Sequence, residues 1–306
     1  MKKIAVIGGG FGGIAAAIRL RAKGDQVTIY ERLSKLGGRA QVFKRGGYMH
    51  DAGPTVITAP NLFYELFDLL GENLEDFLEF RPLDPWYRFH FHDQTEFDYG
   101  PDREKMLAQI KEISPEDVSG YFNMLKESEA IFKLGYEKLA GHPFGKLTTM
   151  LRYAPAIIKM KGYRSVYSFV SKHLKHPNLR QAFSIQPLLV GGNPFTTSSI
   201  YSLIHALEQK WGIFFCMGGT GKLVSELEKL MIRNGIEINY DSDVSHFSTS
   251  GKLITRVNFT NGESKAFDYV VSNADPIQVS TELLKNEKIS MHNRLIKKYA
   301  KHCYNV

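Results

Sequence analysis

The stretch that decides the fold is residues 3–31, which read KIAVIGGGFGGIAAAIRLRAKGDQVTIYE. Short apolar runs rich in β-branched residues, at 3–7 and 26–30, are typical of buried strands. The Ala- and Leu-rich segment 14–23 between them ends in basic residues and is typical of a helix. Because a run of glycines separates the first strand from the helix, the pattern predicts a strand, a tight loop, a helix and a second, parallel strand.

The glycines of this loop match the dinucleotide fingerprint Gly8-x-Gly10-x-x-Gly13. Gly8 allows the tight turn, Gly10 lets the backbone approach a pyrophosphate, and Gly13 lets the helix pack on the strand. The helix N-terminus then presents free N–H groups and a partial positive charge to the phosphates. Glu31 ends the second strand and is placed to accept from both hydroxyls of an adenosine ribose. The pattern predicts a site for ADP, and it does not distinguish FAD from NAD.

The N-terminal stretch also imitates a secretory signal, with a basic start and an apolar run to Ile18. Its glycines argue against that interpretation, because each costs about 1 kcal/mol inside a helix. No later apolar run approaches the roughly 20 residues that cross a bilayer. The two cysteines, Cys216 and Cys303, lie far apart, which disfavours a disulfide framework or a zinc site. We expect a globular, cytoplasmic protein of two domains with no bound metal.

Further elements are predicted along the chain from periodicity, capping residues and turn signals. An alternation of aromatic and polar residues over 86–99 predicts a strand pair with one covered face. Ser114 is expected to cap a helix that Pro115 begins and that runs to about residue 139. Asn261-Gly262 predicts a hairpin turn between strands 252–259 and 264–271. Other expected elements are helices at 61–70, 221–234 and 291–300, mostly helical structure over 141–207, and a strand at 236–240.

The net charge of +7 is concentrated in one region, because residues 138–207 contain no Asp or Glu. Its bases are Lys138, Lys146, Arg152, Lys159, Lys161, Arg164, Lys172, Lys175 and Arg180. One interpretation is a face that docks on an anionic membrane, with Tyr153, Ile157, Ile158, Met160, Tyr163, Tyr167 and Phe169 at the interface. A solvated surface is about equally compatible with the pattern. Nucleic acid is disfavoured because no base-reading motif accompanies the charge.

Two segments after Glu31 bear on the choice of cofactor. Gly37-Gly38-Arg39 suits a second pass of the chain by the pyrophosphate, with Arg39 as counter-charge, although an ordinary loop would look similar. This segment and residues 51–58 (DAGPTVIT) resemble the N-terminal signature of carotenoid desaturases of the phytoene desaturase type. Three further stretches resemble the same family: 183–199 (FSIQPLLVGGNPFTTSS), 211–223 (WGIFFCMGGTGKL) and 271–276 (VSNADP).

The resemblance covers nearly the whole chain and implies non-covalently bound FAD and stepwise dehydrogenation of a C40 or C30 polyene at membranes. The implied fold is a doubly wound α/β domain of the Rossmann-like, glutathione-reductase-like type with an inserted α+β substrate domain and no C-terminal part. The expected division is 1–84 and 213–280 for the FAD domain, 85–212 for the insertion, and 281–306 for a further substrate segment. The protein is expected to be peripheral at the inner membrane surface.

The resemblance also implies roles for individual residues. Gly8, Gly10 and Gly13 would contact pyrophosphate, Glu31 the ribose, and Arg39 the phosphates or the flavin edge. Gly53, Pro54 and Thr55 would lie by the isoalloxazine. Gly12, Arg32 and Gly38 are further expected cofactor contacts. Val244 would contact the adenine, although Asp243-Val244 could equally be a turn that leads into the hairpin.

A polyene offers no group for a nucleophile or a metal to bind. The expected chemistry is therefore hydride transfer from an allylic carbon to flavin N5, with loss of a neighbouring proton, while the protein supplies position and a dry channel. No residue is assigned as a base. His90 and His92 share a face, and with no third ligand nearby we favour structural or surface roles over metal binding. His205 is interpreted as a packed core residue.

Several alternatives stay open: a carotenoid isomerase or a saturase on the same scaffold, an amine oxidase relative, an NAD-dependent dehydrogenase, and a non-catalytic remnant that binds lipid surfaces. Chain length of the substrate, number of desaturation steps and electron acceptor are not assigned. Members of the family are longer and close the flavin domain with a late strand and a glycine-rich segment. We therefore expect a fragment or a truncated product with an open sheet edge, weak FAD binding and low activity.

Overall fold

The computed structural model describes residues 1–138, 151, 153–155, 158, 160–251 and 253–284. The chain divides into two compact units. Unit 1 contains Met1–Thr55, Asn61–Phe80 and the chain from Cys216 onward, whereas unit 2 contains Val56–Pro60 and Arg81–Phe215. The predicted helix at 291–300 lies outside the described residues.

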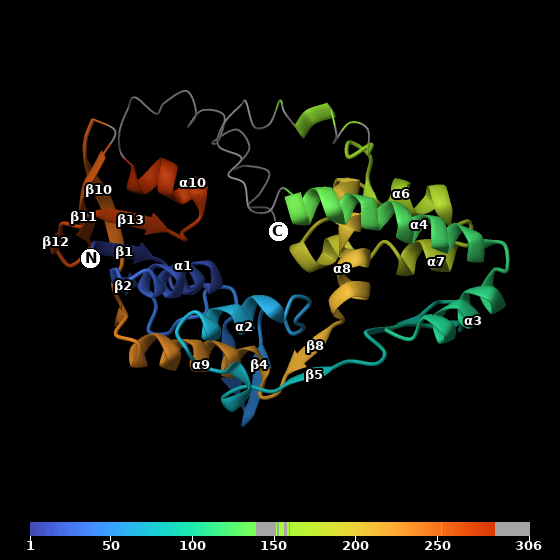
Figure 1. Cartoon of the computed structure of the whole chain (residues 1–306), viewed down its shortest axis with the longest axis horizontal. Coiled ribbons are helices and arrows are strands. Elements are labelled where there is room, and N and C mark those ends of the chain that lie inside the picture. The colour runs from blue at the N-terminus through green and yellow to red at the C-terminus, as the bar shows by residue number, and fades with distance from the viewer. Residues whose placement is uncertain (139–150, 152, 156–157, 159, 252, 285–306) are drawn as a thin grey trace. The chain divides into compact units, whose positions relative to one another are not determined.

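Unit 1 is built on a four-stranded parallel sheet in the order β13-β1-β2-β9. Strands β13, β1 and β2 are labelled in Figure 1. Its strands are β1 (Lys3–Ile7), β2 (Gln26–Tyr30), β9 (Glu237–Asn239) and β13 (Tyr269–Ser272). The first two have the predicted bounds, and β9 lies within the strand predicted at 236–240. A sequence-distant strand flanks each side of the β1–β2 pair. The predicted α/β class is confirmed.

Helices cover one face of this sheet. Helix α1 (Phe11–Ala22) contacts β1 and β2 and buries Ile14, Ala17 and Ile18. Helix α9 (Gly219–Arg233) packs on α1 and β9. Helix α1 begins three residues earlier than predicted, because glycines 12 and 13 serve as its first turn.

A three-stranded antiparallel sheet covers the other face. It consists of β10 (Val244–Ser250), β11 (Leu253–Phe259) and β12 (Ser264–Lys265). Ala5 and Tyr30 of the parallel sheet share a buried cluster with Val257 and Phe259. Because both faces are covered, the parallel strands read as continuous apolar runs rather than as an alternation.

The hairpin prediction was only partly right. Strands β11 and β12 pair around Asn261-Gly262, but the pairing ends at Lys265 rather than continuing to residue 271. The backbone N–H of Lys3 donates to the Asp268 carboxylate (2.7 Å), and the Asp268 N–H donates to the Lys3 carbonyl (2.9 Å). These bonds direct the chain to the edge of the parallel sheet, where β13 pairs with β1.

The rest of unit 1 consists of short elements. They are the hairpin β3 (Val42–Arg45) and β4 (Tyr48–Asp51), α2 (Asn61–Asp68), η1 (Leu74–Asp76), α10 (Pro276–Gln278) and η5 (Val279–Leu283). Strands β5 (Phe80–Pro82) and β8 (Phe214–Cys216) pair with each other where the chain leaves and re-enters this unit.

Unit 2 combines one hairpin with a group of helices. The hairpin is β6 (Tyr87–His90) and β7 (Glu96–Tyr99), which confirms the strand pair predicted from the aromatic alternation. The helices are α3 (Arg103–Ile113), α4 (Asp117–Phe132), η2 (Lys133–Lys138), α6 (Val166–His173), α7 (Pro177–Ala182), η3 (Gln186–Val190), η4 (Ser199–Ser202) and α8 (Leu203–Trp211). Tyr99, Tyr121 and Phe183 are at the centre of the core.

The predicted helix cap at Ser114 is wrong. Ser114 ends α3, which Asp102 caps by accepting from the backbone N–H groups of Glu104 and Lys105. The next helix starts at Asp117, and the Asp117 carboxylate accepts from the backbone of residues 175 and 176 instead of capping α4. Sequence signals for a helix start do not show whether a nearby carboxylate accepts hydrogen bonds from a distant part of the chain instead of capping the helix.

Gly120 of α4 lies so close to α6 that a Cβ there would be 2.0 Å from the carbonyl oxygen of His173. Helix propensity alone predicts that Gly120→Ala stabilises the protein by about 1 kcal/mol. We expect the reverse, a loss of about 1–3 kcal/mol, because the added methyl overpacks the helix contact. Urea unfolding measures the difference, with exposed Ser119→Ala as the control; a stabilised Gly120→Ala variant would contradict the packing.

Candidate functional site

The glycine loop lies between β1 and α1 and has no space for side chains. A Cβ on Gly13 would be 2.0 Å from the carbonyl oxygen of Gly8, and Gly8 itself has φ +95°. A Cβ on Gly12 would be 2.4 Å from the Asn273 side chain. The N-terminus of α1 has no side-chain cap and no acidic residue in its first turn. This arrangement leaves an uncapped, electropositive helix end beside bare backbone, which fits a diphosphate.

The segment Gly37-Gly38 lies directly against this loop. The N–H of Gly37 donates to the carbonyl of Gly9 (2.9 Å), and Gly10 and Gly37 form a parallel bridge. A Cβ on Gly38 would be 3.1 Å from the Gly10 Cα. The structure therefore brings the two glycine segments together, although α1 and β2 lie between them in the sequence.

Glu31 follows β2 and is almost completely buried. One carboxylate oxygen accepts from the Gly9 N–H (2.7 Å) and the other from the Leu33 N–H (2.9 Å). The side chain thus ties the glycine loop to the end of β2. Because a carboxylate has about four acceptor positions, these two bonds leave capacity for ribose hydroxyls.

Asn273 is a site residue to which the sequence assigned no role. It follows β13, which pairs with β1, and its side chain lies over the glycines at positions 10, 12 and 13. The Asn273 N–H donates to the carbonyl of Ile7 (2.8 Å). The available signal was the polar segment at the end of a strand, since ligands of doubly wound sheets lie at the carboxyl ends of the strands.

The other predicted contacts lie on neighbouring loops of unit 1. Arg32 and Arg39 are exposed. Gly53 packs on the chain at Arg39, because a Cβ there would be 2.2 Å from the Arg39 carbonyl oxygen. Pro54 and Thr55 follow it and are exposed.

Val244 is the first residue of β10 and is buried in the cluster that contains Tyr30. The N–H of Ser242, just before it, donates to the Glu31 carbonyl (2.8 Å). The structure thus places Val244 both at the start of the antiparallel sheet and next to the segment that carries the acidic residue.

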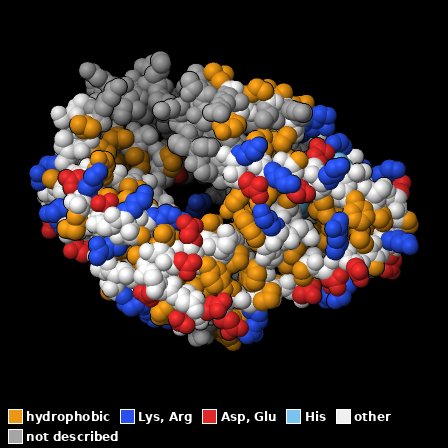
Figure 2. Space-filling view, in the orientation of Figure 1, with side chains coloured by type: hydrophobic (Ala, Val, Ile, Leu, Met, Phe, Trp, Pro, Cys, Tyr) orange, Lys and Arg blue, Asp and Glu red, His pale blue; other side chains and the backbone are white. Residues whose placement is uncertain are grey.

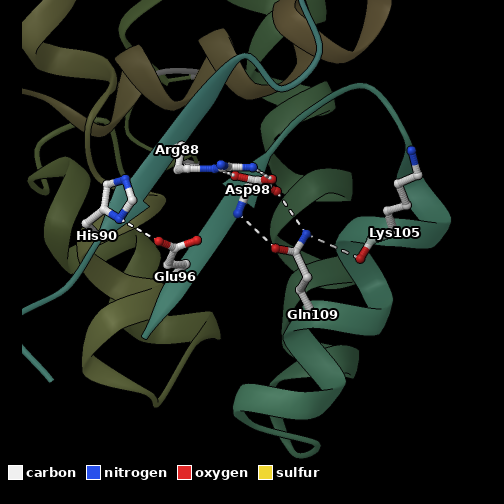
Figure 3. Close-up of polar contacts among 6 residues, drawn as sticks. All are labelled: Arg88, His90, Glu96, Asp98, Lys105 and Gln109. Atoms are coloured by element: carbon white, nitrogen blue, oxygen red, sulfur yellow. Dashed lines mark hydrogen bonds and ion pairs between the residues drawn. The ribbon is translucent and has the colours of Figure 1, made fainter. Parts of the chain in front are cut away.

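The histidines of the unit 2 hairpin are in a different environment. His90 Nδ1 lies 2.8 Å from the Glu96 carboxylate across the strand pair (Figure 3). Arg88 and Asp98 form a bidentate pair beside it, and Gln109 bonds the Asp98 backbone. Among the described residues no group of three or more His, Cys, Asp or Glu side chains could hold a metal ion. His90 has a surface cross-strand role.

A buried polar cluster lies elsewhere in unit 2. Tyr99 donates to Glu208 (2.7 Å), and Gln186 Nε2 lies 3.1 Å from His205 Nδ1. Burial lowers the pKa of His205 to about 4 and raises the pKa of Glu208 to about 7. Within the described part of the chain, Glu208 Oε1 has no hydrogen-bond partner, which favours the neutral acid. His205 is a neutral core residue.

The fold and the glycine-lined cradle define a dinucleotide-binding protein, and the comparison with known families identifies it as a flavoprotein. The family of flavin containing amine oxidoreductases matches residues 11–301, so the chain belongs to this family. Membership confirms the prediction of an FAD cofactor.

Among proteins of known function, the chain is 46% identical over 284 residues to the lycopene-forming phytoene desaturase of Pantoea ananas. It is 34% identical over 281 residues to the neurosporene-forming enzyme of Cereibacter sphaeroides. These matches cover 93% and 92% of this chain, and they confirm the kinship with carotenoid desaturases. The chain spans 58% and 54% of the length of the two relatives.

Solved structures show the same fold at low sequence identity. An oxidoreductase from Methanosarcina mazei has a TM-score of 0.65 at 15% identity and matches 96% of this chain and 65% of its own. Wild-type putrescine oxidase has a TM-score of 0.63 at 16% identity and matches 92% of this chain and 60% of its own. No helix in the described parts of the chain has the length and apolar character to cross a membrane.

The buried pair in unit 2 predicts two opposite pH effects on stability. Because the pKa of Glu208 is raised, the free energy of unfolding falls by up to about 3 kcal/mol as the pH rises from about 4.5 to about 7. Over this range the Glu208 carboxyl ionises only in the unfolded chain. The lowered pKa of His205 removes stability as the pH falls from about 6.5 to about 4. The buried Tyr87 and Tyr121 hydroxyls remain neutral throughout, since burial raises both pKa values.

Glu208→Gln should therefore gain stability relative to the wild type as the pH rises from 4.5 to 7. Denaturant unfolding at several pH values measures this difference, and Glu263→Gln, at an exposed glutamate, is the control. A difference that stays constant with pH would show that Glu208 is ionised in the folded protein.

Proposed function

We propose that this chain serves in the FAD-dependent desaturation of a long polyene such as phytoene. The observation that carries the proposal is the meeting of the Gly8–Gly13 loop, the Gly37-Gly38 turn and Glu31 at the carboxyl ends of β1 and β2. The identity with phytoene desaturases supports the substrate class. No described observation favours an isomerase, a saturase or an NAD-dependent enzyme.

Different residues of the chain would bind different parts of the cofactor. The bare backbone at Gly8, Gly10 and Gly13, together with the uncapped start of α1, would bind the pyrophosphate. Glu31 would accept from the ribose hydroxyls with its remaining acceptor capacity. The backbone at Val244 would meet the adenine. Gly12, Arg32, Gly38 and Arg39 would line the phosphates, and Gly53, Pro54 and Thr55 the ring system.

The polyene would be held by apolar contacts alone, because it has no polar group to bind. When bound, FAD would accept the hydride that leaves an allylic carbon. The protein's part would be to hold that carbon in place and to exclude water. We propose that unit 2 binds the polyene, which the predicted division assigned to residues 85–212.

The desaturation proposal predicts product formation by the purified chain with FAD, phytoene in phosphatidylcholine liposomes and an added quinone. Products with more conjugated double bonds absorb at longer wavelength and are separated by chromatography. Glu31→Ala should lose at least tenfold in FAD affinity and in rate, because a charged acceptor contributes about 1.5–3 kcal/mol per hydrogen bond. Glu263→Ala is the matched control. Phytoene that stays unchanged by a chain with bound FAD would overturn the proposal.

We also propose that unit 2 docks peripherally on an anionic membrane at the inner membrane surface. In the structure, exposed apolar side chains support this docking surface better than the basic residues do. Lys172 pairs with Glu127 of α4, and Lys175 pairs with Glu116, the residue before α4. Acids from outside residues 138–207 therefore offset part of the charge of that region. On the face in view, Lys and Arg lie scattered among Asp and Glu (Figure 2). Phe169, which the pattern placed at the interface, is a buried core residue.

Exposed apolar side chains gather on neighbouring segments of the same region. Leu188, Val190 and Phe195 are 62%, 56% and 62% exposed. The Tyr167 N–H donates to the Pro194 carbonyl (3.0 Å), so the start of α6 adjoins this loop. Exposed Tyr163 lies just before α6. Exposed apolar side chains combined with basic residues bind anionic interfaces.

The docking proposal predicts co-sedimentation with phosphatidylglycerol vesicles that salt weakens. Changing Leu188, Val190 and Phe195 together to Ser should reduce binding at least tenfold, since each buried apolar side chain contributes on the order of 1 kcal/mol. The control changes Ile232 and Leu253 of unit 1, which are 56% and 72% exposed, to Ser. Binding that ignores lipid charge and salt, or equal losses in both variants, would contradict the proposal.

A further inference from the structure

The turn Gly218-Gly219-Thr220-Gly221 at the start of α9 has no role in the cofactor site as so far described. Gly218 and Gly219 have φ +93° and +79°, and α9 has no side-chain cap from its own N-cap residue. The helix nevertheless starts beside an acid. The carboxylate of Asp51, from the end of β4, accepts from the Thr220 N–H at 3.2 Å.

Thr220 connects this helix end to the segment proposed to lie by the ring system. Its hydroxyl donates to the carbonyl of Pro54 at 2.5 Å, and the residue is only 3% exposed. Proline has no N–H, so its carbonyl is the one backbone group through which Pro54 can be held by hydrogen bonding. A buried hydroxyl bonded to that carbonyl restricts the direction of the chain between Gly53 and Thr55.

The glycines around the contact show how closely the three chain segments pack. A Cβ on Gly219 would be 2.9 Å from the Asp51 carboxylate, and one on Gly221 would be 2.6 Å from Val42. On the other side, a Cβ on Gly53 would be 2.2 Å from the Arg39 carbonyl oxygen. The segment 51–54 is therefore fixed between the start of α9 and the chain that follows Gly38.

We propose that Thr220, with Asp51, is a positioning residue that holds Gly53 and Pro54 against the ring end of the FAD site. The inference rests on the proposed FAD site, because the placement of residues 53–55 beside the isoalloxazine is part of that proposal. The pyrophosphate end is built from other contacts, those of Gly9, Gly37 and Glu31. Loss of the Thr220 hydroxyl should therefore affect the two halves of the cofactor unequally.

The test compares the affinities of the 306-residue chain for FAD and for ADP, measured separately by calorimetry. Thr220→Val keeps the shape of the side chain and removes the hydroxyl. It should weaken the affinity for FAD at least fivefold while the affinity for ADP changes less than twofold. Thr220→Ser keeps the hydroxyl and should restore the FAD affinity. The absorption bands of bound FAD should also shift in Thr220→Val, since they report the surroundings of the ring system.

The outcomes separate this inference from the proposed function. A wild-type chain that binds neither ADP nor FAD would refute the proposed cofactor site itself. If the wild type binds both, equal weakening of ADP and FAD in Thr220→Val, or no weakening, would overturn the positioning role. Asp51→Asn keeps Thr220 and the volume of the cap while removing its charge. It should also weaken the affinity for FAD more than the affinity for ADP. This variant tests the positioning role if Thr220→Val does not fold.

Discussion

At Gly13 a Cβ would lie 2.0 Å from the carbonyl oxygen of Gly8, far inside van der Waals contact. Helix α1 can start directly behind β1 only because that methyl group is absent. The same close approach leaves the helix N-terminus bare and places the Gly9 N–H within reach of Glu31. The Gly37 turn and the Asn273 side chain then pack onto the loop. The cofactor cradle is thus a consequence of how one helix meets one strand.

The sequence predicted best what depends on local pattern. Strands β1 and β2 were predicted to the residue, because burial on both faces makes each a continuous apolar run between clear turns. Local pattern could not predict that β9 and β13 pair with β2 and β1, because these strands are distant in the sequence. Thr28, for example, pairs with Glu237, 209 residues away. The contact of Asn273 with the glycine loop and that of Thr220 with Pro54 were not predicted, for the same reason. Their positions depend on tertiary contacts, for which the sequence shows only a short polar segment after a strand.

Unit 2 shows how tertiary contacts change the meaning of a charge pattern. A region without acids looked uniformly basic along the chain, yet Glu116, just before α4, and Glu127, within α4, pair with two of its lysines. The failed cap at Ser114 has a related cause, since Asp117 bonds backbone groups of a later segment instead of its own helix. In both cases a side chain whose role seemed clear from its sequence neighbours interacts instead with a distant part of the chain.

The interrupted course of unit 1 has a consequence for how the protein emerges from the ribosome. Strands β1 and β2 are translated before unit 2, whereas β9 and β13, which pair with them on either side, follow the whole of unit 2. At about 5–20 residues per second, roughly 200 residues take on the order of 10–40 seconds to translate. During that interval the nascent β1–β2 pair has two open strand edges, the kind that invite aggregation. Unit 2, nearly continuous in sequence, can fold within the same interval, so chaperone demand should concentrate on the first thirty residues.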